Sequence, residues 1–134
     1  MFLFLSAQDI NFMEVGLLEE NGRLFSFQKI ITPPENFLSN LSSFLYEQKV
    51  SWEIIKKIVV VSGPGSFTST RLIVTIANAI SFARKLPIVG ITNSEKKNSE
   101  ELIIEQGRDW AILNGVSFVS PVYDRPPNIT IKKM

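Results

Sequence analysis

The sequence has 134 residues, 45% of them hydrophobic, which is enough to bury one core of ordinary size, so a single compact domain is expected. The 14 Lys and Arg and the 13 Asp and Glu are scattered along the chain and leave a net charge of +1, which argues against direct contact with nucleic acid or a membrane surface. Histidine and cysteine are absent, which removes disulfides, thiolate nucleophiles and the commonest zinc ligands, and we expect no catalytic residue, no metal and no cofactor.

The N-terminal part of the chain predicts three antiparallel strands. Short apolar runs at residues 2–5 and 12–18 are separated by a polar break, and residues 24–27 continue the pattern after a turn. Asn21 and Gly22 form a dipeptide that tolerates positive φ in a tight turn. The first run lacks a basic flank and meets polar residues too soon for a signal peptide or a membrane span, so we expect a cytoplasmic protein.

Helices and strands then alternate. Residues 35–48 repeat apolar side chains at the spacing of one helical face and predict a helix. Residues 58–61 and 87–91 suit strands buried on both faces. Between them, residues 67–85 predict a second helix, capped by Ser66 or Thr68, that is apolar most of the way around. Such a helix needs cover on more than one side, from this chain or from a partner.

The pattern changes after residue 91. Residues 93–98 are polar and contain lysines, and they mark the predicted boundary between residues 1–93 and a C-terminal part, residues 94–134. A short helix is predicted from Asn98 or Ser99 through Glu105, with Gly107 ending it. Residues 110–113 and 116–119 have weak strand patterns, and the tail from Pro121 is expected to be extended or irregular.

The clearest local motif is the glycine turn between the strand at 58–61 and the second helix. Free backbone N–H groups at such a turn can bind an anion, but glycines more often serve the geometry of a tight crossover. A Walker loop is excluded because Gly-Lys-Ser/Thr is missing. The residues in question are Gly63, Pro64, Gly65 and Ser66.

Residues 58–93 resemble the TsaB (YeaZ) family of tRNA threonylcarbamoyladenosine biosynthesis. That family has Gly-Pro-Gly-Ser-Phe-Thr-Gly-x-Arg, then an apolar helix and a Pro-x-Val-Gly strand. The opening strands with their Asn-Gly turn are also similar to the family. The residues that match the motif are Gly63, Pro64, Gly65, Ser66, Phe67, Thr68 and Arg71, and Pro121, Tyr123, Arg125, Pro126 and Pro127 are similar to a segment near the family's C-terminus.

The resemblance implies an α/β fold: a single actin-like (ASKHA, ribonuclease H-like) lobe. Its mixed sheet would have about five strands, including the three-stranded meander, and two main helices. Residues 91–121 are too few to hold the family's second lobe, so residues 94–134 are interpreted as its remnant and a C-terminal tail. The family often has Asp-Thr-Ser after the first strand. Here Ser6, Ala7, Gln8 and Asp9 stand there, with Ala7 near the Asp position, which implies a degenerate phosphate site.

The function implied by the resemblance is that of a non-catalytic accessory subunit. It would pair through its two helices with a TsaD-like transferase that modifies tRNA, or with a second copy of itself, and a TsaE-like ATPase is a further candidate partner. The second helix offers two stripes at helical spacing, Leu72, Ile76 and Ala79 or Ile73, Ala77 and Ile80. The predicted partner interface comprises Phe37, Leu41, Phe44, Phe67, Leu72, Ile73, Ile76, Ala77 and Ile80.

Two other interpretations stay open. The surplus apolar face can be covered within the chain itself, because helical apolar stripes belong to cores more often than to interfaces. The protein can also be a nucleotide- or anion-binding hydrolase that uses the turn at residues 63–66, with Asp9 as a metal ligand.

Overall fold

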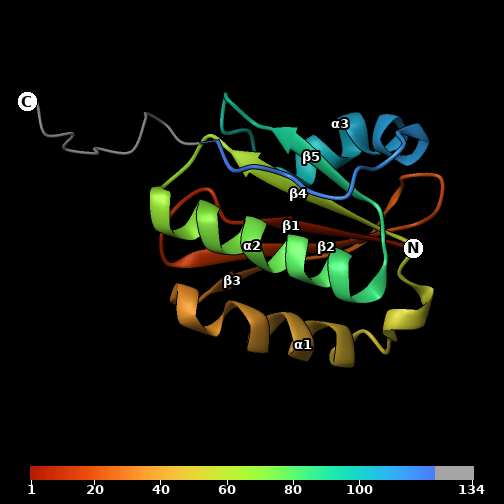
Figure 1. Ribbon diagram of the computed structural model, residues 1–134, viewed down its shortest axis with the longest axis horizontal. Helices are drawn as coiled ribbons and strands as arrows, with labels where there is room; N and C mark the ends of the chain where they lie inside the picture. Colours follow the sequence, from red (N-terminus) through yellow and green to blue (C-terminus); the bar gives the residue numbers. More distant parts are fainter. Residues whose placement is uncertain (123–134) are drawn as a thin grey trace, which may run out of the picture.

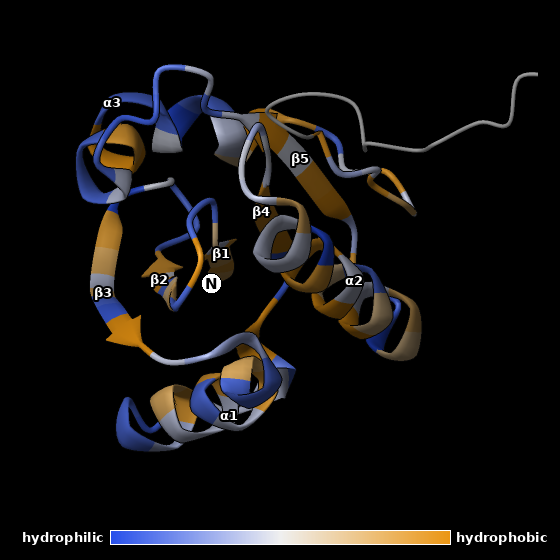
Figure 2. Ribbon diagram, turned by 90° about the vertical axis from the view of Figure 1, so that its left-hand side faces the viewer, coloured by the Kyte–Doolittle hydropathy of each residue, from blue (hydrophilic) through white to orange (hydrophobic). Residues whose placement is uncertain are grey.

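The computed structural model describes residues 1–122 of the chain. A five-stranded sheet forms the middle of three layers, with α1 and α2 on one face and α3 on the other (Figures 1 and 2). The strands are β1 (Phe2–Ser6), β2 (Phe12–Leu18), β3 (Leu24–Ile31), β4 (Lys57–Gly63) and β5 (Ile88–Thr92). The helices are α1 (Phe37–Glu47), α2 (Phe67–Arg84) and α3 (Ser99–Ile112), and two short 3-10 helices are η1 (Pro34–Asn36) and η2 (Trp52–Ile54).

The sheet is mixed, with strand order β3-β2-β1-β4-β5. β1, β2 and β3 form the predicted antiparallel meander, whereas β4 and β5 run parallel to β1. Gly22 has a φ of 90° in the hairpin between β2 and β3, and its N–H donates to the Glu19 carbonyl at 2.8 Å. The parallel strands place the end of β1, the end of β4 and the start of α2 at one edge of the sheet.

The two faces of the sheet bury separate cores. Leu3 and Leu5 of β1 point toward α1 and α2, and the intervening Phe2 and Phe4 point toward α3. On the α3 side, the Phe4 and Trp110 rings stack with their centroids 5.8 Å apart. Lys57 of β4 caps the C-terminal end of α3, because its Nζ donates to the carbonyl oxygens of residues 110, 111 and 113.

The predicted fold class is confirmed, and so are the five strands and the two main helices. The C-terminal prediction is wrong in detail, because α3 continues through Gly107 to Ile112 and includes residues 110–112 that had a weak strand pattern. Gly107 does not stop the helix. A methyl group there would collide with the Gly22 carbonyl oxygen, so the glycine lets α3 approach the β2–β3 hairpin.

Residues 116–119 do not form a strand either. Val116 makes one isolated antiparallel bridge with Ile88. The described part of the C-terminal region, α3, packs against the same sheet as the rest of the chain. That residues 94–134 are a remnant of a second lobe stays a prediction. None of the described helices combines the length and the hydrophobicity that crossing a membrane requires.

Candidate functional site: a closed turn and an apolar helical face

The glycine turn joins β4 to α2 at the edge of the sheet. The peptide bond between Gly63 and Pro64 is cis, and Gly63 has a φ of 129°. A side chain at Gly63 would collide with the Val122 carbonyl oxygen. At Gly65, a Cβ atom would lie 2.5 Å from the carbonyl oxygen of Gln8. Both glycines therefore allow two backbone segments to approach closely, which a side chain at either position would prevent.

Three backbone polar groups of the turn are bound by other segments of the chain. The Ser66 N–H donates to the Gln8 carbonyl at 2.7 Å, and the Asn93 N–H donates to the Gly63 carbonyl at 2.8 Å. The Gln8 amide donates to the Pro64 carbonyl at 2.6 Å and to the Asn93 carbonyl at 3.0 Å, while the Asn93 amide donates back to Gln8 Oε1 at 3.0 Å. Gln8 and Asn93 are both buried. We call this turn closed, because these hydrogen bonds join it to neighbouring segments of the same chain.

This closure favours the geometric interpretation of the glycines over the anion site. The Ser66 N–H at the start of α2 already has a carbonyl acceptor, and the Gln8 side chain lies against the turn. Asp9, the metal ligand of the hydrolase interpretation, is exposed and lies 4.0 Å from Lys96 Nζ in a surface ion pair. Within residues 1–122, no group of three His, Cys, Asp or Glu side chains could hold a metal ion.

A half-buried carboxyl group near this edge was not singled out from the sequence. Glu14 of β2 accepts a hydrogen bond from the Ser99 hydroxyl at 2.6 Å. Burial raises the pKa of Glu14, and the hydrogen bond from Ser99 and the charge of Lys29 partly offset this effect. Its place inside the apolar run of β2 is a signal that sequence reasoning could have used.

Five of the predicted interface residues lie in the core and are not available to a partner. They occupy the inward stripes of α1 and α2 and pack against the sheet. Helical spacing explains their burial, because the sheet packs against one stripe of each helix. The five buried residues are Phe37, Leu41, Phe44, Ile73 and Ala77.

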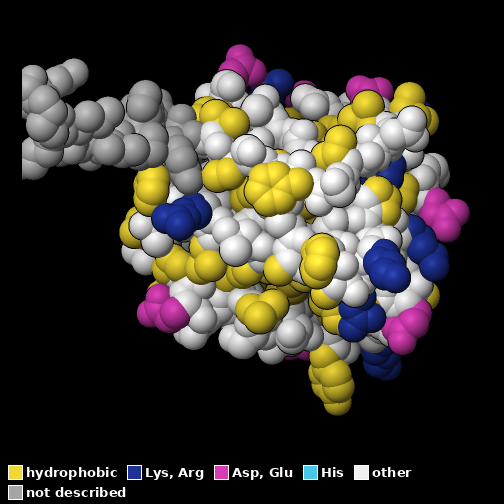
Figure 3. All heavy atoms as spheres, viewed as in Figure 1, with side chains coloured by type: hydrophobic (Ala, Val, Ile, Leu, Met, Phe, Trp, Pro, Cys, Tyr) yellow, Lys and Arg dark blue, Asp and Glu magenta, His cyan; other side chains and the backbone are white. Residues whose placement is uncertain are grey.

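The remaining four predicted interface residues border an apolar surface. Leu72, Ile76 and Ile80 of α2 are half-buried at the margin of the core, and Phe67 is exposed. The stripe with Leu72 and Ile76 thus faces outward more than the stripe with Ile73 and Ala77. In Figure 3, hydrophobic side chains gather over α2 and between α2 and α1, while charged side chains lie toward the rim of this face.

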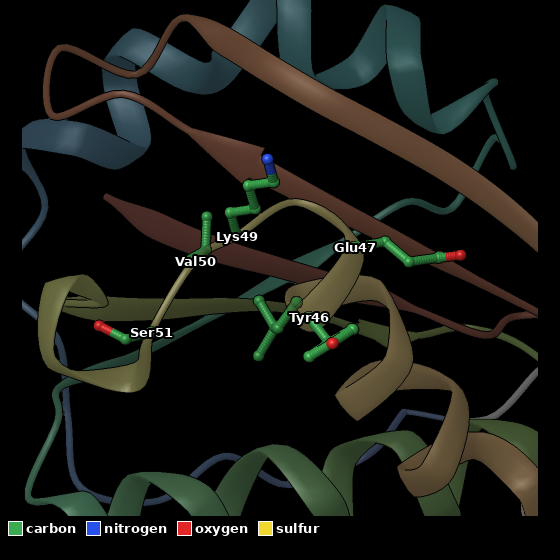
Figure 4. A pocket seen from close by; sticks show the side chains of 6 residues that line it. Tyr46, Glu47, Lys49, Val50 and Ser51 are labelled. Atoms are coloured by element: carbon green, nitrogen blue, oxygen red, sulfur yellow. The ribbon is translucent and has the colours of Figure 1, made fainter.

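Other exposed apolar residues of these two helices lie outside the predicted set. Leu38 of α1 and Phe82 of α2 are exposed, and so is Tyr46 near the end of α1. Tyr46 also borders a shallow open hollow at the C-terminal end of α1. In Figure 4 the side chains of Glu47 and Lys49 point in different directions, so the hollow has no convergent polar groups. Its lining residues are Leu45, Tyr46, Glu47, Lys49, Val50 and Ser51.

The C-terminal motif is described only in its first two residues. Pro121 is half-buried, and the N–H of Val122 donates to the Ser62 carbonyl at 2.6 Å. The predicted similarity at Tyr123, Asp124, Arg125, Pro126 and Pro127 lies outside the described residues.

Comparisons with known proteins agree with this architecture. The family model TsaD, described as tRNA N6-adenosine threonylcarbamoyltransferase, matches residues 34–102, which is just over half of the chain. A search of curated proteins finds no significant match.

Solved structures share the fold. YeaZ from Pseudomonas aeruginosa superposes with a TM-score of 0.60 and 24% identity, over 69% of this chain and 44% of that chain. A second structure, of an uncharacterized protein described as similar to peptidase YEAZ from Pseudomonas aeruginosa, gives a TM-score of 0.59 and 23% identity with the same coverage. The chain therefore spans less than half the length of these two proteins.

Proposed function

The chain belongs to the TsaD family, and from this premise we propose that it is a non-catalytic accessory subunit that pairs through α1 and α2 with a TsaD-like transferase. In this role it supports N6-threonylcarbamoylation of adenosine in tRNA, while the transferase supplies the chemistry and contacts the tRNA.

The observation that carries this proposal is the apolar surface over α1 and α2. Leu72, Ile76 and Ile80 lie half-buried beside the core, and Leu38 of α1 and Phe67 of α2 are exposed. Hydrophobic side chains gathered on one face of a small protein are typical of interaction sites. Covering them with the apolar face of another helix pair would remove them from water.

The closed turn supports an accessory role in place of catalysis. In related actin-like lobes, the segment after the first strand would handle phosphate and metal. Here Gln8 and Asn93 bind the turn, and Asp9 points to solvent. The accessory subunit would then act by binding the active conformation of the transferase more tightly than its other conformations, which shifts the population toward the active form.

Co-expression with the TsaD-like transferase of the same organism tests this proposal. A one-to-one complex, measured by light scattering, is expected for the wild type. Ile76→Asp should abolish it, because the charge would be buried without a partner. Ile73→Asp is unsuitable as a test, since Ile73 is in the core and its replacement would unfold the protein.

The matched control is Ile112→Asp. Ile112 is 82% exposed at the end of α3, on the opposite side of the sheet from α1 and α2. This variant should bind like the wild type. A monomer, or a homodimer that ignores the transferase, would refute the assigned partner.

A further inference from the structure

Two asparagines of the chain are each followed by glycine. Asn21 lies in the hairpin between β2 and β3, and Asn114 lies just after α3. In such a dipeptide the backbone nitrogen of the glycine can attack the side-chain amide carbon of the asparagine, because no Cβ atom hinders the approach. This reaction is deamidation, which converts asparagine to aspartate or isoaspartate without an enzyme, and asparagine is one of the thermolabile residues of proteins.

The Asn21–Gly22 dipeptide is held by hydrogen bonds. The Gly22 N–H donates to the Glu19 carbonyl at 2.8 Å, and Asn21 Oδ1 accepts from the Arg23 N–H at 2.9 Å. Gly22 is also buried, and its backbone lies so close to α3 that a Cβ atom there would collide with the Gly107 carbonyl. The hairpin therefore has to open before a base can remove the Gly22 proton and before the Asn21 amide can turn toward it.

The Asn114–Gly115 dipeptide lacks these restraints. Asn114 is exposed, and within residues 1–122 neither its side chain nor the Gly115 N–H has a hydrogen-bond partner. α3 ends at Ile112, and the first backbone N–H beyond it that is bound again is that of Val116, which donates to the Ile88 carbonyl at 2.8 Å. Neither reacting group is thus engaged by the described part of the chain.

Two further asparagines precede serine, another small residue, but both are held. Asn93 is buried, and its amide donates to Gln8 Oε1 at 3.0 Å. Asn98 is the N-cap of α3, and its Oδ1 accepts from two backbone N–H groups of the first turn at 2.9 and 3.2 Å. Each side chain would have to give up these hydrogen bonds before its amide carbon could be attacked.

We propose that Asn114 is a site of spontaneous deamidation and the first asparagine to react in the folded protein. The Gly115 nitrogen loses its proton to hydroxide and forms a bond to Asn114 Cγ, the bond from Cγ to Nδ2 breaks, and ammonia leaves. Water then adds to one carbonyl of the resulting cyclic imide. Breaking the new bond gives aspartate, whereas breaking the original peptide bond gives isoaspartate, whose main chain runs through Cγ.

The isoaspartate product has a structural consequence at the edge of the sheet. It puts an extra carbon atom into the main chain between α3 and the bridge that joins Val116 to Ile88. Gly115 is closely packed there, because a Cβ atom would collide with Pro87 at the start of β5. The longer chain therefore displaces Val116 and loosens residues 114–122, which run in blue past β5 in Figure 1.

The test is incubation of the full chain at mildly alkaline pH, with peptide mass spectrometry at intervals. We expect Asn114 to be converted at least about tenfold faster than Asn21, because the hairpin must first lose two hydrogen bonds. A protein isoaspartate methyltransferase should label the product peptide. Asn114→Gln should abolish this labelling, since glutamine would have to form a larger and slower ring, and circular dichroism should show that the variant is folded.

Incubation of the same chain in denaturing urea is the matched control. The two Asn-Gly dipeptides lose their different surroundings there and should react at similar rates. If Asn21 reacts as fast as Asn114 in the folded protein, the inference is overturned. The isoaspartate form, separated by ion exchange, should exchange the Val116 N–H faster than the untreated protein, and equal exchange would refute the loosening of residues 114–122.

Discussion

Replacing Lys57 with methionine tests how α3 is held to the sheet. The buried ammonium group donates three hydrogen bonds, of 3.1, 3.2 and 2.7 Å, to carbonyls at the C-terminal end of α3. Methionine keeps an unbranched side chain over the Phe2 ring, which lies 4.8 Å from Lys57 Nζ, but it has no donor. Hydrogen bonds from a charged group contribute about 1.5–3 kcal/mol each.

The expected loss is smaller than the sum of these bonds. Ile112 and Leu113 are exposed, so water can reach part of the freed helix end, and the cost of burying the ammonium group disappears in the variant. We expect unfolding free energy to fall by about 2–3 kcal/mol. Urea denaturation followed by circular dichroism measures it, and hydrogen exchange should show the last turn of α3 opening first.

The matched control is Lys56→Met. Lys56 is the exposed neighbour of Lys57, and its Nζ makes one surface hydrogen bond, to the Glu53 carbonyl at 3.0 Å. Its replacement should change the unfolding free energy by less than about 0.5 kcal/mol. If Lys57→Met is as stable as the control, the three hydrogen bonds do not stabilise the docking of α3 and the argument is wrong.

Two further changes test local features of the fold. Gly107→Ala should lower the unfolding free energy by about 1–2 kcal/mol in urea denaturation, because the methyl group would collide with the Gly22 carbonyl. Helix propensity alone predicts the opposite, a rise in unfolding free energy of up to about 1 kcal/mol, and that result would contradict the collision. Burial raises the pKa of Glu14 above 4.5 in the folded state, so ionising it costs stability as pH rises from about 4.5. The unfolding free energy of Glu14→Gln should therefore match that of the wild type near pH 4 and exceed it by pH 7. If urea denaturation gives the same difference in unfolding free energy at both pH values, the raised pKa of Glu14 is refuted.

Elements with a strong repeating pattern could be predicted from the sequence, and the TsaB-like resemblance is confirmed at the level of family and fold. The β-branched run of β4 and the spacing of α1 and α2 follow from local periodicity. The role of Gly107 inside α3 could not be predicted, because it depends on the close approach to Gly22, which is 85 residues earlier. Local sequence carries no sign of that contact.

The candidate interface shows the same limit. Periodicity gave two stripes on α2, but the choice between them depends on how the helix is rotated against the sheet. The structure places Ile73 and Ala77 inward. The burial of Val119 could not be predicted either, because its backbone is bound by Asn78, which lies 41 positions earlier in the chain.

The residue type at position 8, next to Ala7 at the end of β1, is linked to the closed turn by hydrogen-bond chemistry. Gln8 Nε2 lies between the carbonyl oxygens of Pro64 and Asn93 and donates to both. A carboxylate in the same position would place negative oxygens against two acceptors with no proton between them, which is unfavourable in a buried site. A phosphate group brought to this position would meet the same two carbonyls. These polar groups at this end of the sheet are thus already paired within the chain, which disfavours a phosphate site there.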